Sequence, residues 1–131
     1  MIHKNTLPIK RQNKFYLFPP KGGIMSWIYL ILAICLEVAG TTNMKLSQGF
    51  TKILPSILLF VFYACSFSLM TIVLKKIDVS VAYTIWSGFG TALIVGIGII
   101  WFKESVTLMK MISIILIIIG VIGLKLSSGA Q

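Results

Sequence analysis

A single glutamate, Glu37, interrupts an apolar stretch that runs from Trp27 to Met44 without another charged residue. An acidic side chain at that depth in a membrane costs about 2.5–3.5 kcal/mol on insertion scales. Acids inside membranes are rare for this reason, and they usually mark the path of an ion, a proton or a substrate. Glu37 is therefore the first candidate for chemistry in this chain. The alternative is structural: Glu37 stays protonated and only hydrogen-bonds at a helix interface.

The residues on the same helical face as Glu37 leave room beside its carboxylate. Side chains three and four positions apart in a helix share a face. On this face most side chains are small, and an aromatic ring lies further back: Tyr29, Ala33, Gly40, Thr41 and Met44. Small residues let helices approach closely in lipid, and here they also open a space next to the acid.

The segment VAYTIWSGFG supplies aromatic rings at a similar depth. Tyr83 and Trp86 are three positions apart and share a face, and Tyr63 adds a ring from the preceding apolar run. Aromatic residues near the ends of such runs serve as membrane-interface anchors, but these three lie deeper. Gly88 and Gly90 weaken the helix around them, so we predict a hinge there, although glycine is common in membrane helices.

A carboxylate and aromatic rings in one apolar space form a receptor for a lipophilic cation. The acid compensates the positive charge, and the ring faces attract the cation by about 2 kcal/mol or more when water is excluded. Without a cation, the same acid is expected to take up a proton, because apolar surroundings disfavour its charged form. A site that holds either a proton or a cation, but not both, can exchange one for the other. That exchange is the chemistry of an antiporter.

The elements that must position these residues are membrane helices. The chain of 131 residues is 57% hydrophobic and 11% charged, whereas soluble domains are about 45–50% apolar and about 25% charged. Four apolar runs approach the length of about 20 residues that crosses a bilayer: Trp27–Met44, Leu54–Leu74, Val79–Phe102 and Met111–Leu124. Because backbone in hydrocarbon must satisfy its own hydrogen bonds, we predict an all-α membrane protein of four transmembrane helices, at about residues 27–45, 54–75, 79–102 and 108–127.

The positive charge of the chain does not indicate nucleic-acid binding. The formal net charge is +9, but five of the twelve basic residues precede the first helix: Lys4, Lys10, Arg11, Lys14 and Lys21. The other seven lie in short loops or at helix ends, where lysine is common in membrane proteins. Cys35 and Cys65 lie inside apolar runs without a CxxC spacing, and His3 has no partner in sequence, so no metal site or cofactor is expected. No nucleophile, base and orienting group occur together, which argues against an enzyme.

The first 24 residues are basic, contain three prolines and lack the apolar core of a secretory signal. We predict that they are not part of the native protein, whose translation would start at Met25. Lys21-Gly22-Gly23 can be encoded as AAAGGAGGT, a strong bacterial ribosome-binding sequence just upstream of that methionine. A disordered basic arm near anionic headgroups and a tag remnant are the other interpretations.

The lysines of residues 25–131 are divided almost evenly between the two sides of a four-helix protein. With helices that alternate in direction, three lysines share one side and four share the other: Lys75, Lys76 and Lys125 against Lys45, Lys52, Lys103 and Lys110. The positive-inside rule then gives little preference, so such a chain can insert in either orientation. The leader would change the count to eight against four and favour one orientation. Two copies in opposite orientations would form the inverted repeat that many transporters use.

The last apolar run, MISIILIIIGVIGL, carries a stripe of small residues formed by Ser113 and Gly120, seven positions apart. Such stripes let two membrane helices pack closely, and we predict that these residues form a seam between two copies of the chain. Plain exposure to lipid is the alternative.

From Met25 to about Ser127, the chain resembles the small multidrug resistance transporters, in particular their EmrE-like multidrug subtype. The resemblance rests on phrases that occur in order and with matching spacing: LEVAGTTNMKLSQGF, Pro55-Ser56, AYTIWSGFGTAL and FKE. It implies an antiparallel, dual-topology dimer in the bacterial inner membrane that exports cationic compounds in exchange for protons. By motif position, Glu37 matches the acid shared by proton and substrate. The resemblance also assigns an aromatic site and the lining of the glutamate's face: Tyr63, Tyr83 and Trp86, with Tyr29, Ala33, Gly40 and Thr41.

Gly40 bears on the subtype. The resemblance implies tryptophan three residues after the glutamate in guanidinium exporters and glycine in multidrug members, so quaternary ammonium and ethidium-like cations are the expected substrates. A guanidinium exporter is the alternative within the family. Asp78 and Ser80 depart from the proline and glycine common in that loop and resemble paired, two-gene (Ebr-like) systems. The chain is therefore expected to act as a homodimer or as one subunit of a heteromer; a structural subunit that does not itself transport is a third interpretation.

Overall fold

The computed structural model describes residues 23–128, apart from the side chains of Lys125 and Ser128. It contains four α-helices in that range: α1 (Ile24–Leu46), α2 (Ile53–Val73), α3 (Val79–Ile100) and α4 (Leu108–Ser128). Each helix begins and ends within three residues of the bounds predicted from the sequence. The predicted leader lies outside the described residues except for Gly23 and Ile24, so its absence from the native protein stays a prediction.

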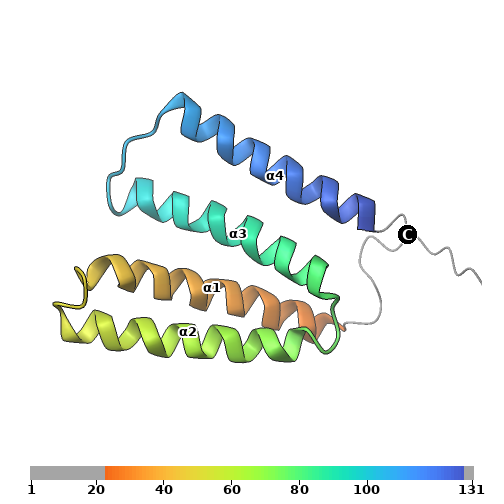
Figure 1. Ribbon diagram of the computed structural model, residues 1–131, viewed down its shortest axis with the longest axis horizontal. Helices are drawn as coiled ribbons and strands as arrows, with labels where there is room; N and C mark the ends of the chain where they lie inside the picture. The colour runs from red at the N-terminus through yellow and green to blue at the C-terminus, as the bar shows by residue number, and fades with distance from the viewer. Residues whose placement is uncertain (1–22, 129–131) are drawn as a thin grey trace, which may run out of the picture.

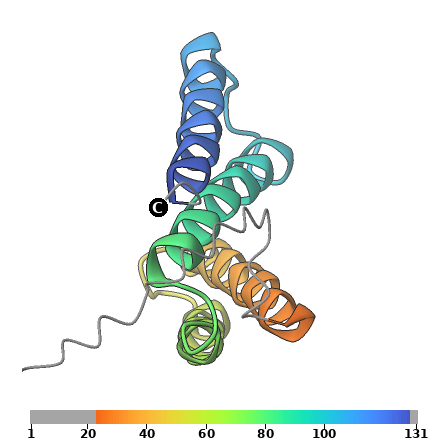
Figure 2. The ribbon, with the colours of Figure 1, turned by 90° about the vertical axis from the view of Figure 1, so that its right-hand side faces the viewer.

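The helices alternate in direction, and the loops fall at two ends of the molecule (Figure 1). The α1–α2 and α3–α4 loops lie at one end, and the α2–α3 loop lies at the other. α1 packs against both α2 and α3, whereas the main contact of α4 is with α3. Viewed along the helices, α4 stands away from α1 and α2, so the four helices form an open arrangement (Figure 2).

Hydroxyl side chains within the helices bond back to their own backbone. Thr42, Ser56, Ser68 and Ser113 each donate a hydrogen bond of 2.6–2.9 Å to the carbonyl four residues earlier. A polar group in lipid must find its partner within the protein, and this local bond supplies one. These residues therefore fit into a membrane helix without a partner on a neighbouring helix.

The core lies where α1, α2 and the start of α3 meet. Leu30, Ile34 and Val38 recur every four positions on α1, and each is at most 5% exposed. They pack with buried residues from the other two helices and the loop between them: Val73, Ile77 and Ala82. Deeper in the α1–α2 interface, the buried hydroxyl of Ser66 donates to the carbonyl of Ala33 at 2.7 Å. The beginning of α3 is thus part of one packed unit with α1 and α2.

Among the described residues, three helices are long and apolar enough to cross a membrane: α1, α2 and α3. The apolar stretch of α4 is shorter, Leu108–Leu124. The outward surfaces carry large apolar side chains such as Phe60, Phe89 and Ile119, each more than half exposed. Such a surface suits lipid or a second chain rather than water. The prediction of an all-helical membrane protein is confirmed for this part of the chain, while the fourth crossing and the antiparallel dimer stay predictions.

Gly88 and Gly90, the predicted hinge, lie within a continuous helix. A Cβ atom on Gly88 would come within 2.8 Å of Cγ2 of Val121 on α4, a separation that real Cβ atoms essentially never show. Gly88 is therefore a point of close approach between α3 and α4. The structure gives this glycine a packing role, and its role as a hinge stays a prediction.

Replacing Gly88 with alanine is expected to loosen α4 from α3 and to lower the melting temperature of the purified protein in detergent. Overpacking of this kind costs about 1–3 kcal/mol. Gly96→Ala is the matched control, because no atom lies within 4 Å of the Cβ position of Gly96 and alanine is the better helix former. Adding Val121→Ala to Gly88→Ala should restore the melting temperature. If Gly88 served only as a hinge, Gly88→Ala would not lower the melting temperature, and adding Val121→Ala would not restore it.

Candidate functional site

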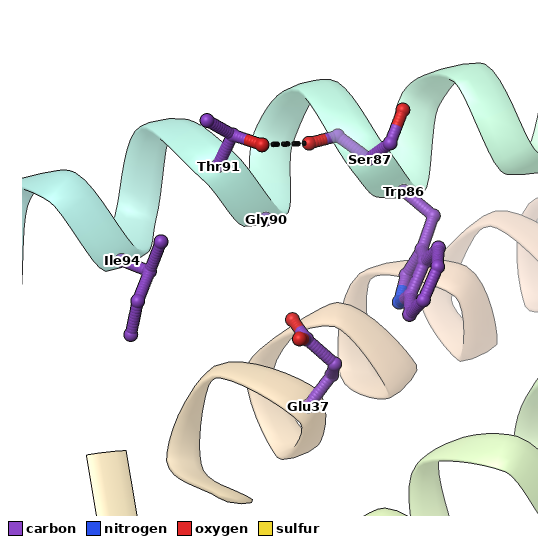
Figure 3. Close-up of a pocket in the computed structure, with 6 residues that line it drawn as sticks. All are labelled: Glu37, Trp86, Ser87, Gly90, Thr91 and Ile94. Carbon is purple, nitrogen blue, oxygen red and sulfur yellow. Dashed lines mark hydrogen bonds between the residues drawn. The ribbon is translucent and has the colours of Figure 1, made fainter. Parts of the chain in front are cut away.

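A cavity of about 220 Å³ lies between α1 and α3 (Figure 3). α1 contributes Glu37, and α3 contributes the other lining residues: Trp86, Ser87, Gly90, Thr91 and Ile94. The carboxylate of Glu37 points from α1 toward α3, and the ring of Trp86 reaches down beside it (Figure 3). The acid singled out in the sequence thus shares a cavity with an aromatic ring.

Gly90 allows the carboxylate to come close to the backbone of α3. A Cβ atom at this position would lie 3.3 Å from Oε2 of Glu37, which is tighter than most Cβ contacts. Trp86, Gly90 and Ile94 follow one another at intervals of four, so they form one face of α3. This face turns toward α1 and forms the wall opposite the acid.

The polar groups of this wall differ in what they can still bind. The hydroxyls of Ser87 and Thr91 donate to carbonyls of their own helix, at 3.2 Å and 2.7 Å. Their oxygen atoms can therefore still act as acceptors. Nε1 of Trp86 is buried and has no hydrogen-bond partner within the described part of the chain. Since an unpaired buried donor is unfavourable, this N–H is available to a bound molecule or to the carboxylate beside it.

Glu37 is also connected to α2 through a hydroxyl group. Oγ1 of Thr41 donates to Oε1 of Glu37 at 3.1 Å and lies 2.8 Å from the hydroxyl of Tyr63. Because Thr41 gives its proton to the carboxylate, its oxygen accepts from Tyr63. Gly40 makes room for this ring, since a Cβ atom there would lie 3.2 Å from the nearest ring carbon of Tyr63. A chain of hydrogen bonds therefore orients the acid from the α2 side.

The aromatic side chains form a row from α2 to α3. Phe67 lies between Tyr63 and Trp86, with ring centroids 6.0 Å from the first and 6.4 Å from the second. The ring centroid of Tyr83 lies 5.5 Å from that of Trp86, and Tyr83 is 61% exposed. Centroid separations of about 4.5–7 Å are the favourable range for aromatic pairs. The three deep aromatic residues noted in the sequence belong to one group, which Phe67 completes.

Two residues predicted to line the face of the glutamate lie elsewhere. Tyr29 is half-buried and packs against the core, and Ala33 is fully buried between α1 and α2. Neither lines the cavity, and a part for them in substrate binding stays a prediction, as it does for four further residues outside the lining: Gly40, Thr41, Tyr63 and Tyr83. Sequence reasoning also missed Phe67 and three of the lining residues: Ser87, Thr91 and Ile94. Extending the helical spacing from Tyr63 by one turn would have found Phe67, and extending it from Trp86 by two turns would have found Ile94.

Ser113 and Gly120, the predicted seam of a dimer, lie on the exposed face of α4. The hydroxyl of Ser113 is turned to its own helix, and no atom lies within 4 Å of the Cβ position of Gly120. This face is therefore open to lipid or to a second chain, and the seam stays a prediction.

A second polar cluster lies at the end of the molecule that carries the α1–α2 and α3–α4 loops. Glu104 in the α3–α4 loop pairs with Lys45 in the last turn of α1 at 2.6 Å and with Lys110 in the first turn of α4 at 3.1 Å. Nζ of Lys45 also lies 4.3 Å from the centre of the Phe102 ring. Hydrogen bonds from Lys45, which has the larger effect, and from Lys110 hold the pKa of Glu104 below its ordinary value. The stabilisation from these pairs is therefore complete above that ordinary value and is lost only as the pH falls through the lowered pKa.

Comparison with known proteins identifies the family. The profile described as Small Multidrug Resistance protein matches residues 25–117. The uncharacterized membrane protein YvaE of Bacillus subtilis (strain 168) is 57% identical over 78% of this chain and 86% of its own length. The multidrug resistance protein EbrA of Bacillus atrophaeus is 39% identical over 76% and 94%, and a guanidinium exporter of Yersinia pestis is 38% identical over 79% and 100%. With most of its helical part matched in this way, the chain belongs to the small multidrug resistance protein family.

Proposed function

We propose that this chain is a proton-coupled antiporter that exports lipophilic aromatic cations. The observation that carries the proposal is the cavity between α1 and α3, where the carboxylate of Glu37 lies beside the ring of Trp86. An acid and a ring face in an apolar wall attract a cation by charge and by cation–π contact. Family membership adds support, because relatives are named for multidrug resistance and for guanidinium export.

Exchange follows from competition for one carboxylate. A protonated Glu37 is neutral and offers a cation no charge compensation, so the proton leaves before the cation binds. The proton returns from the side where protons are abundant and displaces the cation there. Alternating access of the site to the two sides of the membrane makes this exchange directional. Inward movement of the proton supplies about 2.3 kcal/mol per charge for each 100 mV of membrane potential.

The working unit in this proposal is an antiparallel dimer in the bacterial inner membrane, with Glu37 of both copies in one chamber. In one chain the cavity has walls from α1 and α3 only, so a second copy or a paralogous subunit would complete it. The nearly even division of lysines between the two sides supports insertion in both orientations. The proposed exchange requires no cofactor.

Export of guanidinium is the second candidate, because a relative of that name is 38% identical to this chain. Gly40 favours the aromatic cations, because the family resemblance implies glycine at this position in multidrug members and tryptophan in guanidinium exporters. A single added carbon at this position would already lie 3.2 Å from the ring of Tyr63, so a large side chain would displace that ring. The ring would then leave the hydrogen-bonded chain through Thr41 that orients Glu37.

Growth of cells that express residues 25–131 in ethidium, benzalkonium or guanidinium tests the proposal. Tolerance to ethidium and benzalkonium should rise, and an equally abundant Glu37→Gln chain should confer none. Tolerance to guanidinium alone would establish the second candidate. Tolerance that requires a co-expressed paralogous subunit would establish a heteromer, and no tolerance with or without that subunit would contradict the proposal.

A further inference from the structure

We propose that the ion pair between Lys45 and Glu104 is a latch that closes the Glu37 cavity at the end of the molecule carrying the α1–α2 and α3–α4 loops. The inference rests on the proposed transport function, since it assigns two positioning residues to the opening of that site. Lys45 and Glu104 are 59 positions apart in the chain, so their contact at 2.6 Å is made by the fold. It joins the end of α1 to the segment that follows α3.

The latch and the acid lie on the same two helices in the same register. α1 and α3 run in the same direction (Figure 1). Glu37 faces Gly90, Lys45 follows Glu37 by eight positions, and Gly98 follows Gly90 by eight positions. At a rise of 1.5 Å per residue, the latch therefore lies about 12 Å from the acid along the helices. An ion pair there bridges the two walls of the cavity on its loop side.

Glu104 is held in place by the end of α3. Its backbone N–H donates to the carbonyl of Gly98 at 3.0 Å, and a Cβ atom on Gly98 would lie 2.9 Å from Oε2 of Glu104. The left-handed backbone of Lys103, with φ of 54°, lets the loop fold back onto the helix. The carboxylate thus moves with α3, while Lys45 belongs to α1. Separating the two helices at this end requires their ion pair to break.

The opposite end of α1 and α3 is joined by apolar packing. There, Leu30 and Ile34 of α1 lie in a buried cluster with Ala82 of α3. Opening that end would forfeit a close-packed apolar contact. The side chains of Lys45 and Glu104 are 51% and 40% exposed, and an ion pair so accessible to water is readily exchanged for hydration. The latched end is therefore the end at which α3 can move away from α1.

The test measures access to the cavity directly. In a chain with Cys35→Ala and Cys65→Ala, an added Ile94→Cys places the single thiol on the cavity wall between the acid and the latch. The rate of its modification by a charged, water-soluble thiosulfonate is measured on the purified protein in micelles. Lys45→Gln and Glu104→Gln should each raise this rate about threefold or more. Salt at about 1 M KCl should accelerate the parent but not these variants, because it screens an exposed ion pair.

Lys110 supplies the matched control. It bonds the same carboxylate but belongs to α4, so Lys110→Gln should leave the rate within about twofold of the parent, as should Lys45→Arg, which keeps the charge. Equal rates in the parent and Glu104→Gln, or equal effects of Lys110→Gln and Lys45→Gln, would overturn the latch. Binding of tetraphenylphosphonium to the unsubstituted protein separates the two proposals. Failure of the unsubstituted protein to bind this cation contradicts transport, whereas a labelling rate that is the same in the parent, Lys45→Gln and Glu104→Gln contradicts the latch.

Discussion

Replacing Glu37 with glutamine is expected to lower the affinity of the protein for tetraphenylphosphonium by about 100-fold or more. The substitution keeps the size of the side chain and removes the charge that compensates the cation. Removing one partner of a buried charge pair costs about 3–5 kcal/mol, and about 1.4 kcal/mol corresponds to a factor of ten in affinity. The remaining binding should no longer depend on pH, because no exchangeable proton is left at the site. Calorimetric titration of the purified protein at two pH values measures both effects.

Glu37→Asp is the matched control, since it keeps the acid and shortens the side chain by one methylene group. It should bind the cation in a pH-dependent manner but more weakly, because the carboxylate withdraws from Gly90 and from the hydroxyl of Thr41. If Glu37→Gln kept an affinity within about tenfold of the parent with its pH dependence intact, another group would have to carry the exchange.

Replacing Trp86 with alanine is expected to lower the affinity for the same cation by about 30-fold. A cation–π contact with the water excluded contributes about 2 kcal/mol or more, and tryptophan offers the strongest ring face. Trp86→Phe keeps a ring and removes the unpaired indole N–H, so its loss should be several times smaller. The same calorimetric titration measures both variants against the parent.

Phe89 provides the control for aromatic bulk on α3. Phe89 is 62% exposed and does not line the cavity, although it lies only three positions from Trp86. Phe89→Ala should leave the affinity unchanged. Equal losses for Phe89→Ala and Trp86→Ala would mean that these rings support the fold of α3 rather than the cation.

Much of the fold could be predicted because lipid leaves the backbone few choices. Apolar length marks the helices, and the spacing of side chains shows that Tyr83 and Trp86 share a face. The same local spacing places small residues beside Glu37. It does not show that Gly90 lies opposite that acid, because the alignment of α1 with α3 is set by packing over the whole length of both helices.

The long-range polar contacts could not be predicted in this way. Lys45 and Glu104 look like independent loop charges in the sequence, and their pairing depends on the register of two helices and on the backbone turn at Lys103. Because glycine weakens a helix, the sequence predicts a hinge at Gly88. In the fold, its missing side chain admits Val121. A local pattern does not reveal which neighbour fills the space beside a glycine.

α4 is joined to the other helices mainly through α3. At 1.5 Å per residue its 21 residues, Leu108–Ser128, span about 31 Å, close to the thickness of about 30 Å of the hydrocarbon core of a bilayer. In the predicted four-helix crossing, a bilayer of another thickness would tilt α4 or be deformed around it. Because Gly88 of α3 is in close contact with Val121 of α4, a change in the tilt of α4 would be transmitted to the helix that carries Trp86. The thickness of the membrane would thereby act on the geometry of the proposed cation site.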